Sequence, residues 1–99
     1  MQKIYDKMIS ELGLNPEEVP LLAGETVRQE YDGCCWQHNA IIAKLPTVIP
    51  NSYPISSRNL PAQEDHCHFT TEAYRQFGQR FAGQMLLILE KLKLKKKAN

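Results

Sequence analysis

Titratable side chains cluster in residues 63–82, "QEDHCHFTTEAYRQFGQRFA", where Asp65 stands three residues before His68 with His66 and Cys67 between them. On a loop that turns into a helix, this D-x-x-H spacing allows the aspartate to fold back against the histidine. The carboxylate then accepts the Nδ1 proton, which fixes the tautomer and leaves Nε2 as a general base. The same spacing also fits two loop residues that cap the start of a helix.

Zinc binding is the alternative hypothesis, because the chain contains several zinc-type ligands. The three consecutive residues 66–68 allow at most two ligands to reach one ion, and the sequence has no C-x-x-C pair. A cysteine at 34 or 35 has helical ligand spacing with His38, but such a site needs partners from far along the chain. The alternative is a small zinc-binding or interaction module without catalysis, built from His66, Cys67, His68, Cys34, Cys35 and His38.

The three cysteines do not form the pattern of a disulfide framework, because the number is odd and Cys34 and Cys35 are adjacent. The sequence therefore predicts reduced thiols and a cytoplasmic location. The opening "MQKIYDKMISELG" is amphipathic rather than continuously apolar, so no signal peptide is expected. No apolar run approaches the roughly 20 residues that a membrane span needs, so no membrane partner is expected.

Length and composition indicate one domain over residues 1–99, with 42% apolar and 23% charged residues. The net charge of +1 is unevenly distributed, because five of the twelve basic residues are lysines between positions 91 and 97. Residues 91–99 are expected to be a lysine-rich helix end or tail, where cations oppose the negative end of the helix dipole. No aromatic residue alternates with these lysines, so nucleic acid is not expected as a partner.

Apolar spacing predicts an amphipathic helix over residues 2–12 that ends at Gly13, followed by a short helical turn over 15–18. The apolar run 19–23 is typical of a strand buried on both faces. Residues 35–45 then follow helical spacing up to a stop at Pro46.

Val48, Ile49, Tyr53 and Ile55 stand in positions compatible with a strand, but Pro50 and Pro54 restrict that strand to an edge or a short length. A final helix begins after Thr70 as N-cap, and Phe69 and Tyr74 stand at the positions of a hydrophobic staple. We expect Gly78 and Ala82 to allow this helix to approach the sheet. Its apolar stripe is predicted to run through Tyr74, Phe77, Phe81, Met85, Ile88 or Leu89, and Leu92.

The resulting order is α-β-α-β-α, which implies an α/β fold with a short parallel sheet covered by helices. Two strands alone do not complete such a fold, because a parallel sheet needs neighbours on each side and cover on both faces. The chain is therefore expected to self-associate, or to pair with a missing amino-terminal segment that supplies further strands.

The stretches "VPLLAGE", "HNAIIAKLP", "IPNSYPISS" and "DHCHFTTEAYRQFGQRFA" together resemble the carboxy-terminal part of SGNH-type carbohydrate esterases. The resemblance runs from about residue 10 to 85, and it is closest to carbohydrate esterase family 6, which includes acetylxylan esterases and sialate O-acetylesterase-like proteins. It implies part of a flavodoxin-like three-layer α/β/α fold. It also implies that His68 is the general base of a Ser-His-Asp triad and Asp65 its orienting carboxylate. An acetylated carbohydrate is the implied substrate, and no metal or organic cofactor is implied.

The nucleophile block of these esterases, Gly-Asp-Ser or Gly-Gln-Ser-Asn near the amino terminus, is absent from the sequence. Ser52, Ser56 and Ser57 are interpreted as loop or strand-end residues. The resemblance thus implies a serine ester hydrolase of which this chain carries the acid and base, and the chain alone is expected to be inactive.

Overall fold

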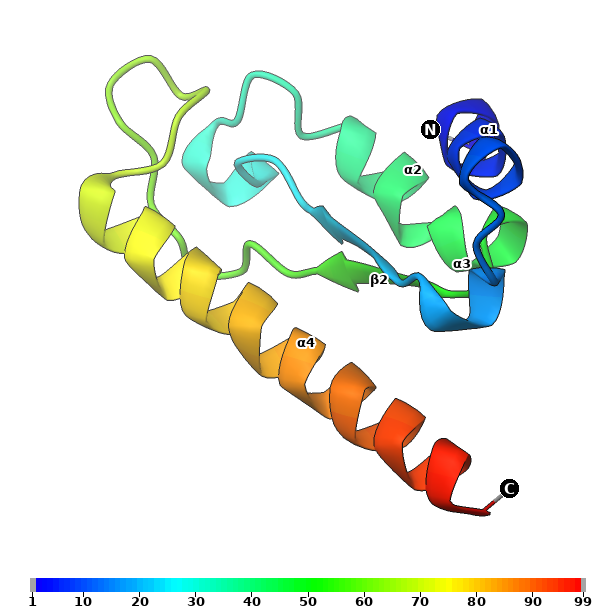
Figure 1. Ribbon diagram of the computed structural model, residues 1–99. Helices are drawn as coiled ribbons and strands as arrows, with labels where there is room; N and C mark the ends of the chain where they lie inside the picture. The colour runs from blue at the N-terminus through cyan, green and yellow to red at the C-terminus, as the bar shows by residue number, and fades with distance from the viewer. Residues whose placement is uncertain (1, 99) are drawn as a thin grey trace.

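A computed structural model describes residues 2–98 (Figure 1). It shows a mixed α/β arrangement with a two-stranded parallel sheet, which confirms the predicted alternation of helices and strands. The elements in chain order are α1 (Gln2–Leu12), η1 (Pro16–Glu18), β1 (Leu21–Gly24), η2 (Gln29–Tyr31), α2 (His38–Ala43), α3 (Leu45–Val48), β2 (Ser52–Ile55) and α4 (Thr71–Ala98).

The first helix and the turn after it form as the sequence predicts. Gly13 follows α1 with φ +62°, a left-handed conformation that glycine adopts without steric cost. Asn15 Oδ1 accepts a hydrogen bond from the Glu17 backbone N–H at 3.0 Å and so caps η1. Tyr5 is buried, and its hydroxyl donates to the Val19 carbonyl at 2.7 Å. This bond holds α1 against the chain that enters β1.

The two strands pair in parallel from Leu21 opposite Ser52 to Gly24 opposite Ile55. The first strand thus lies slightly later than the predicted 19–23, because Pro20 has no N–H and pairing starts where Leu21 N–H donates to Asn51 O at 2.9 Å. Within residues 2–98 each strand has one partner, so both outer edges of the sheet are open.

The single helix predicted over 35–45 is wrong in its boundaries. Residues 34–37 form turns, and two short helices follow, α2 and α3. Pro46 does not stop a helix; it lies in the first turn of α3, where a missing N–H costs no hydrogen bond. Val48 consequently ends α3 rather than opening a strand, and β2 is confined to four residues.

Apolar side chains pack on both faces of the sheet in two clusters, because successive residues of β1 point to opposite sides. On the face toward α4, Leu22 contacts a buried cluster of Val27, Ile55, Leu60, Phe69, Ala73 and Phe77. On the other face, Leu21 contacts a cluster of Tyr5, Ala23, Ile42, Leu45 and Ile49. Figure 1 shows the corresponding arrangement, with α4 on one side of the strands and α1 and α2 on the other.

The last helix starts as predicted. Thr70 Oγ1 accepts from Ala73 N–H at 3.1 Å, and the rings of Phe69 and Tyr74 meet edge to face with centroids 5.5 Å apart. Among the two alternatives in the apolar stripe, Ile88 is buried and Leu89 is exposed.

The predicted approach through Gly78 and Ala82 is wrong, because Gly78 lies in open space. The close contact is made instead by Gly24 of β1, where an added Cβ would stand 2.8 Å from Phe77 Cζ and 3.0 Å from Phe81 Cζ. The glycine whose lack of a side chain allows the two elements to pack therefore lies in the strand and not in the helix.

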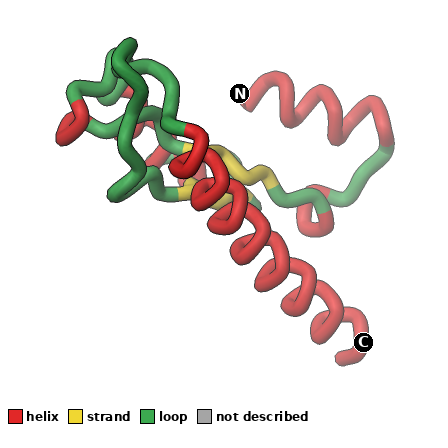
Figure 2. The backbone as a smooth tube through the Cα atoms, turned by 90° about the vertical axis from the view of Figure 1, so that its left-hand side faces the viewer, coloured by secondary structure: helices red, strands yellow, loops and turns green. Residues whose placement is uncertain are grey.

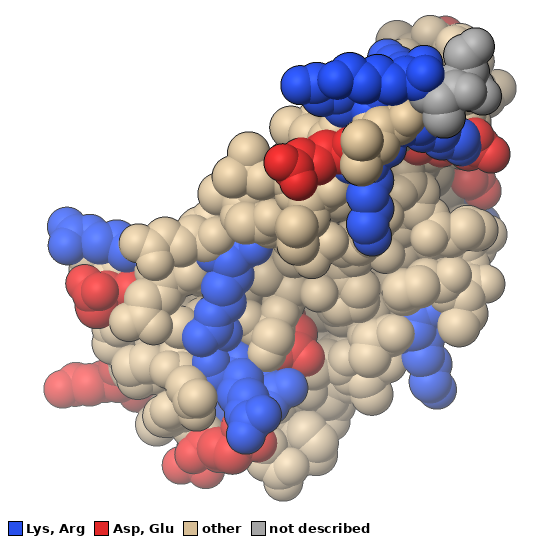
Figure 3. All heavy atoms as spheres, turned by 90° about the horizontal axis from the view of Figure 1, so that it is seen from below, with Lys and Arg blue, Asp and Glu red and all other residues tan. Residues whose placement is uncertain are grey.

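The carboxy-terminal half of α4 extends past the sheet (Figure 2), and it carries the lysines predicted to form a helix end. Figure 3 shows blue basic side chains next to the grey terminus, while most of the neighbouring surface is uncharged. Lys95 Nζ lies 2.9 Å from Glu17 Oε2, which ties this end of the helix to η1. No helix within residues 2–98 is long and apolar enough to cross a membrane.

We predict opposite effects from adding one methyl group at two glycines. Gly24→Ala should destabilise the chain by about 1–3 kcal/mol, because Phe77 and Phe81 must shift to admit the Cβ. Gly78→Ala should stabilise it by about 0.5–1 kcal/mol, since the site is open and alanine favours helix. Denaturant melts of the two variants measure both effects. Equal stabilities would show that β1 and α4 do not pack at Gly24.

Candidate functional site

The loops that follow β1 and β2 leave the sheet at the same end, because the strands are parallel. Figure 2 shows most of the loop structure gathered at this end of the molecule, where α4 begins. Ligands of open α/β sheets bind at the carboxyl ends of the strands. The segments at this end are residues 25–37 and 56–70, and the second contains the D-x-x-H pair.

Asp65 and His68 are in direct contact. Asp65 Oδ2 lies 2.5 Å from His68 Nδ1, and Asp65 Oδ1 accepts hydrogen bonds from the backbone N–H groups of Cys67 and His68, each at 3.0 Å. One carboxylate oxygen therefore shapes the turn while the other binds the imidazole. With Nδ1–H donating to Asp65, the Nε2 atom of His68 is left as a proton acceptor. The side chain of Asp65 is 47% exposed and that of His68 is 65% exposed, so Nε2 of His68 is open to a substrate.

The backbone of this turn is held from several directions. His66 adopts a left-handed conformation with φ 58°, which lets the chain reverse between Asp65 and His68. Gln63 N–H donates to the His68 carbonyl at 2.7 Å, and the Gln63 side-chain amide donates to the Phe69 carbonyl at 2.9 Å. These bonds fix His68 between the turn and the buried ring of Phe69.

The hydrogen bond to His68 and the two backbone N–H bonds from Cys67 and His68 lower the pKa of Asp65 from 3.8 to about 2. The carboxyl group is therefore ionised at neutral pH, which suits the stabilisation of a positive charge on the imidazole. Because the pair is half exposed, solvent screens it and its contribution to stability is small. Its principal effect is to orient His68.

A disulfide joins Cys34 to Cys67, with Cα atoms 5.3 Å apart, so the prediction of three reduced thiols is wrong. Of the two adjacent cysteines, only Cys34 forms a disulfide. Cys35 is exposed with a free thiol, and its Sγ lies 3.6 Å from Cys34 Sγ. The argument for a cytoplasmic location from thiol usage therefore fails. The bond fastens the Asp65–His68 turn to the loop that follows β1.

The loop after β1 reaches Cys67 because of one glycine. A Cβ on Gly33 would lie 1.9 Å from the Val27 carbonyl oxygen, so no other residue fits without moving the backbone. Gly33 N–H donates to Arg28 O at 3.1 Å, and Cys34 N–H donates to His66 O at 3.0 Å. His66 Nδ1 also lies 3.2 Å from Tyr31 O. The disulfide thus reinforces a contact that hydrogen bonds already make.

The zinc alternative receives no support from this geometry. The disulfide occupies two of the thiols on which it depended, Cys34 and Cys67. Among residues 2–98, no three histidine, cysteine or acidic side chains are grouped so that they could hold a metal ion.

The three serines considered near the site have structural roles. Ser52 and Ser57 are buried and donate to the carbonyls of Ile49 and Thr26 at 2.6 and 2.8 Å. Ser56 Oγ accepts from Arg58 N–H at 3.1 Å. The interpretation of these serines as loop or strand-end residues agrees with their positions.

Glu25, the residue directly after β1, connects the two loops. Its carboxylate accepts from Ser57 N–H at 2.7 Å and from Arg28 Nε at 3.3 Å. Burial raises the pKa of Glu25, but the hydrogen bonds from Ser57 and Arg28 outweigh this and leave the pKa lowered. The signal in the sequence is its place directly after a strand, where a carboxylate can join neighbouring strand ends.

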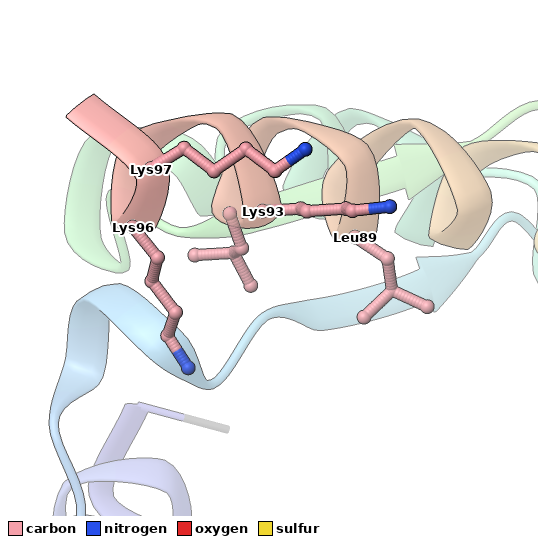
Figure 4. A pocket seen from close by; sticks show the side chains of 5 residues that line it. Leu89, Lys93, Lys96 and Lys97 are labelled. Carbon is pink, nitrogen blue, oxygen red and sulfur yellow. The ribbon is translucent and has the colours of Figure 1, made fainter.

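A hollow of about 410 Å³ near the end of α4 is not part of this site (Figure 4). Its lining comes from this helix alone, namely Leu89, Leu92, Lys93, Lys96 and Lys97. It lies on the part of α4 remote from Asp65 and His68, which precede the first turn of the same helix.

Comparison with known families covers most of the chain. The family model for carbohydrate esterase, sialic acid-specific acetylesterase, matches residues 1–87. The chain therefore belongs to this family of carbohydrate esterases, and the resemblance seen in the sequence is confirmed at that level. No solved structure matches the chain.

The disulfide should contribute substantially to stability. It closes a loop between residues 33 apart in sequence, for which the reduction of unfolded-state entropy corresponds to about 3–4 kcal/mol. Cys67→Ser, or treatment of the wild type with a reductant, should lower the melting temperature, and the reductant should not alter Cys67→Ser further. Cys35→Ser is the matched control and should melt like the wild type. A wild type insensitive to reductant would contradict the pairing.

The ionisation of Asp65 should appear in the pH dependence of stability. Because its pKa is lower in the folded chain than the ordinary 3.8, Asp65 stabilises the fold above that pH. The contribution is lost as the pH falls from 3.8 towards about 2. Asp65→Asn retains an oxygen that accepts the backbone bonds but lacks the charge.

The melting temperature of Asp65→Asn should therefore lie below that of the wild type at pH 6, and the difference should shrink as the pH falls below 3.8 and vanish below about 2. Glu64→Gln, a change at the neighbouring exposed acid, should show no such pH-dependent difference. A difference that persists unchanged in acid would contradict the lowered pKa.

Proposed function

We propose that this chain provides the acid–base part of a serine-dependent carbohydrate O-acetylester hydrolase. His68 acts as the general base through Nε2, and Asp65 orients the imidazole and stabilises its protonated form. The observation that carries the proposal is the contact between Asp65 Oδ2 and His68 Nδ1, in a chain that belongs to a family of carbohydrate esterases. The substrate class is an acetylated carbohydrate.

The reaction follows from this arrangement. His68 Nε2 accepts the proton of a serine hydroxyl as its oxygen attacks the acetyl carbonyl, and then donates that proton to the sugar oxygen as its bond to the acetyl carbon breaks. Water next attacks the acetyl-serine and gives a proton to His68, which passes it to the serine oxygen as the bond between that oxygen and the acetyl group breaks and acetate leaves. The negative charge of Asp65 favours the imidazolium formed in each half. No metal or organic cofactor enters these steps.

We propose that the serine and its oxyanion donors come from a segment on the amino-terminal side of a longer polypeptide or from a partner chain. Large apolar side chains support this, because several are strongly exposed: Ile4, Leu12, Ile41, Leu86 and Leu94 are each more than 60% accessible. The open strand edges offer pairing for further strands, as a flavodoxin-like three-layer fold requires. Self-association of the chain is the other route by which these surfaces become covered.

The catalytic proposal predicts how the chain behaves with and without a serine segment. Alone, it should not react with a fluorophosphonate probe, since Ser52 and Ser57 are buried and hydrogen-bonded, and the exposed Ser56 has a hydrogen bond to Arg58 N–H rather than to a histidine. Joined to the amino-terminal segment of a carbohydrate esterase, it should hydrolyse aryl acetates. In that protein His68→Ala should abolish serine-dependent turnover, and Asp65→Asn should lower kcat by about four orders of magnitude, as the loss of the orienting carboxylate does in other triads.

His66→Asn is the matched control, because asparagine also tolerates a positive φ and the exposed imidazole of His66 does not touch Asp65 or His68 through any side-chain bond. This variant should keep most of the activity. An active His68→Ala variant, or an inactive His66→Asn variant that folds, would show that His68 is not the general base. Strong fluorophosphonate labelling of the chain alone would mean that it contains its own nucleophile.

A further inference from the structure

A hollow of about 290 Å³ lies beside the loop that follows β1. It is lined on one side by residues that surround η2 and on the other by the turn before α2 and the start of that helix. The lining residues are Arg28, Gln29, Glu30, Trp36, Gln37, Asn39 and Ala40. Its volume is close to the lower end of the range for small-molecule sites, which suits a single ring rather than a larger ligand.

The lining combines an exposed aromatic side chain with exposed amides. Trp36 remains 37% exposed, although burying an indole in the core would release far more apolar surface from water. The C–H bonds on one face of a pyranose ring pack on an aromatic face, while its hydroxyl groups need planar donors and acceptors around the rim. The exposed amides of Gln29 and Gln37 supply both a carbonyl and an NH₂ group.

The charges beside the hollow favour an uncharged ring. The Arg28 guanidinium is already shared with Glu25, through Nε–Oε1 at 3.3 Å and Nη2–Oε2 at 3.5 Å. Glu30 adds a negative charge at the rim and is exposed. An acidic sugar would bring its carboxylate against Glu30 and would have to compete with Glu25 for the only cation of the lining, which costs binding energy.

The hollow lies near the proposed catalytic pair. Trp36 is two residues from Cys34, whose Cα is 5.3 Å from that of Cys67, the neighbour of His68. Since consecutive Cα atoms are 3.8 Å apart, the Cα atoms of Trp36 and His68 are separated by at most about 17 Å. An oligosaccharide of a few rings spans this distance.

We infer that Trp36, Gln29 and Gln37 form a subsite for an uncharged pyranose ring of the carbohydrate substrate, within a few rings of the one that carries the acetyl ester. This inference rests on the proposed function for the identity of the substrate. The binding itself needs no nucleophile and is measurable on the chain as it is. Failure of the subsite and failure of the catalytic proposal are therefore distinguishable.

The test uses the fact that Trp36 is the single tryptophan of the chain, so its fluorescence reports on this hollow alone. Titration with methyl β-galactopyranoside should change the emission saturably, and His68→Ala should bind equally well. Saturation-transfer NMR with the same glycoside should show Trp36→Ala weakened by at least about tenfold, which corresponds to the loss of one aromatic stacking contact.

Tyr74→Leu is the matched control, because Tyr74 is another exposed aromatic residue and leucine preserves its apolar contact with Phe69. This variant should bind the glycoside like the wild type. Circular dichroism establishes that each variant is folded. Absence of saturable binding, or equal binding by folded Trp36→Ala, would overturn the subsite. Tighter binding of free N-acetylneuraminic acid than of the uncharged glycoside would overturn the assignment of an uncharged ring.

Discussion

Parallel pairing of β1 and β2 is the constraint on which the arrangement of the chain depends. Parallel strands cannot be joined by a hairpin, so the chain between them must return along the sheet, and α2 and α3 occupy that return. Because of the same pairing, the segments after Gly24 and after Ile55 both leave the sheet at the carboxyl ends of the strands. Contacts that hold the candidate site, among them Glu25 with Ser57 and Cys34 with Cys67, join these two segments.

Different kinds of contact hold the site in place along its length. Near the sheet, the partly buried carboxylate of Glu25 binds a backbone N–H and a guanidinium, which fixes the strand ends. Farther out, where little apolar surface is buried, the covalent bond between Cys34 and Cys67 holds the turn. One carboxylate oxygen of Asp65 accepts a backbone hydrogen bond, and the other binds the imidazole of His68. Such support around a reactive side chain limits its motion and aligns it before substrate arrives.

The sequence predicted features that depend on neighbouring residues. The cap at Thr70, its staple between Phe69 and Tyr74, and the D-x-x-H contact are all encoded within a few positions, and the structure contains each of them. Features that depend on distant residues were predicted poorly. The close approach at Gly24 requires knowledge of where Phe77 lies, and the partner of Cys34 is 33 residues away.

Proline produced a different kind of error. Pro46 reads equally well as the end of one helix or the first turn of the next, since its missing N–H is harmless in both places. Only the packing of Leu45 and Ile49 into the core beside Ala23 decides between them.

The length of α4 makes the molecule elongated, with extents of 50 × 27 × 20 Å and a radius of gyration of 15.5 Å, against about 13 Å for a compact chain of this size. The outer end of the protruding part of α4 is held by the contact of Lys95 with Glu17. Because both partners are exposed, dissolved salt weakens that contact over the Debye length. The outer end of α4 is therefore held by a contact that salt weakens, while the loops at the opposite end of the helix are fastened by a covalent bond that salt does not affect.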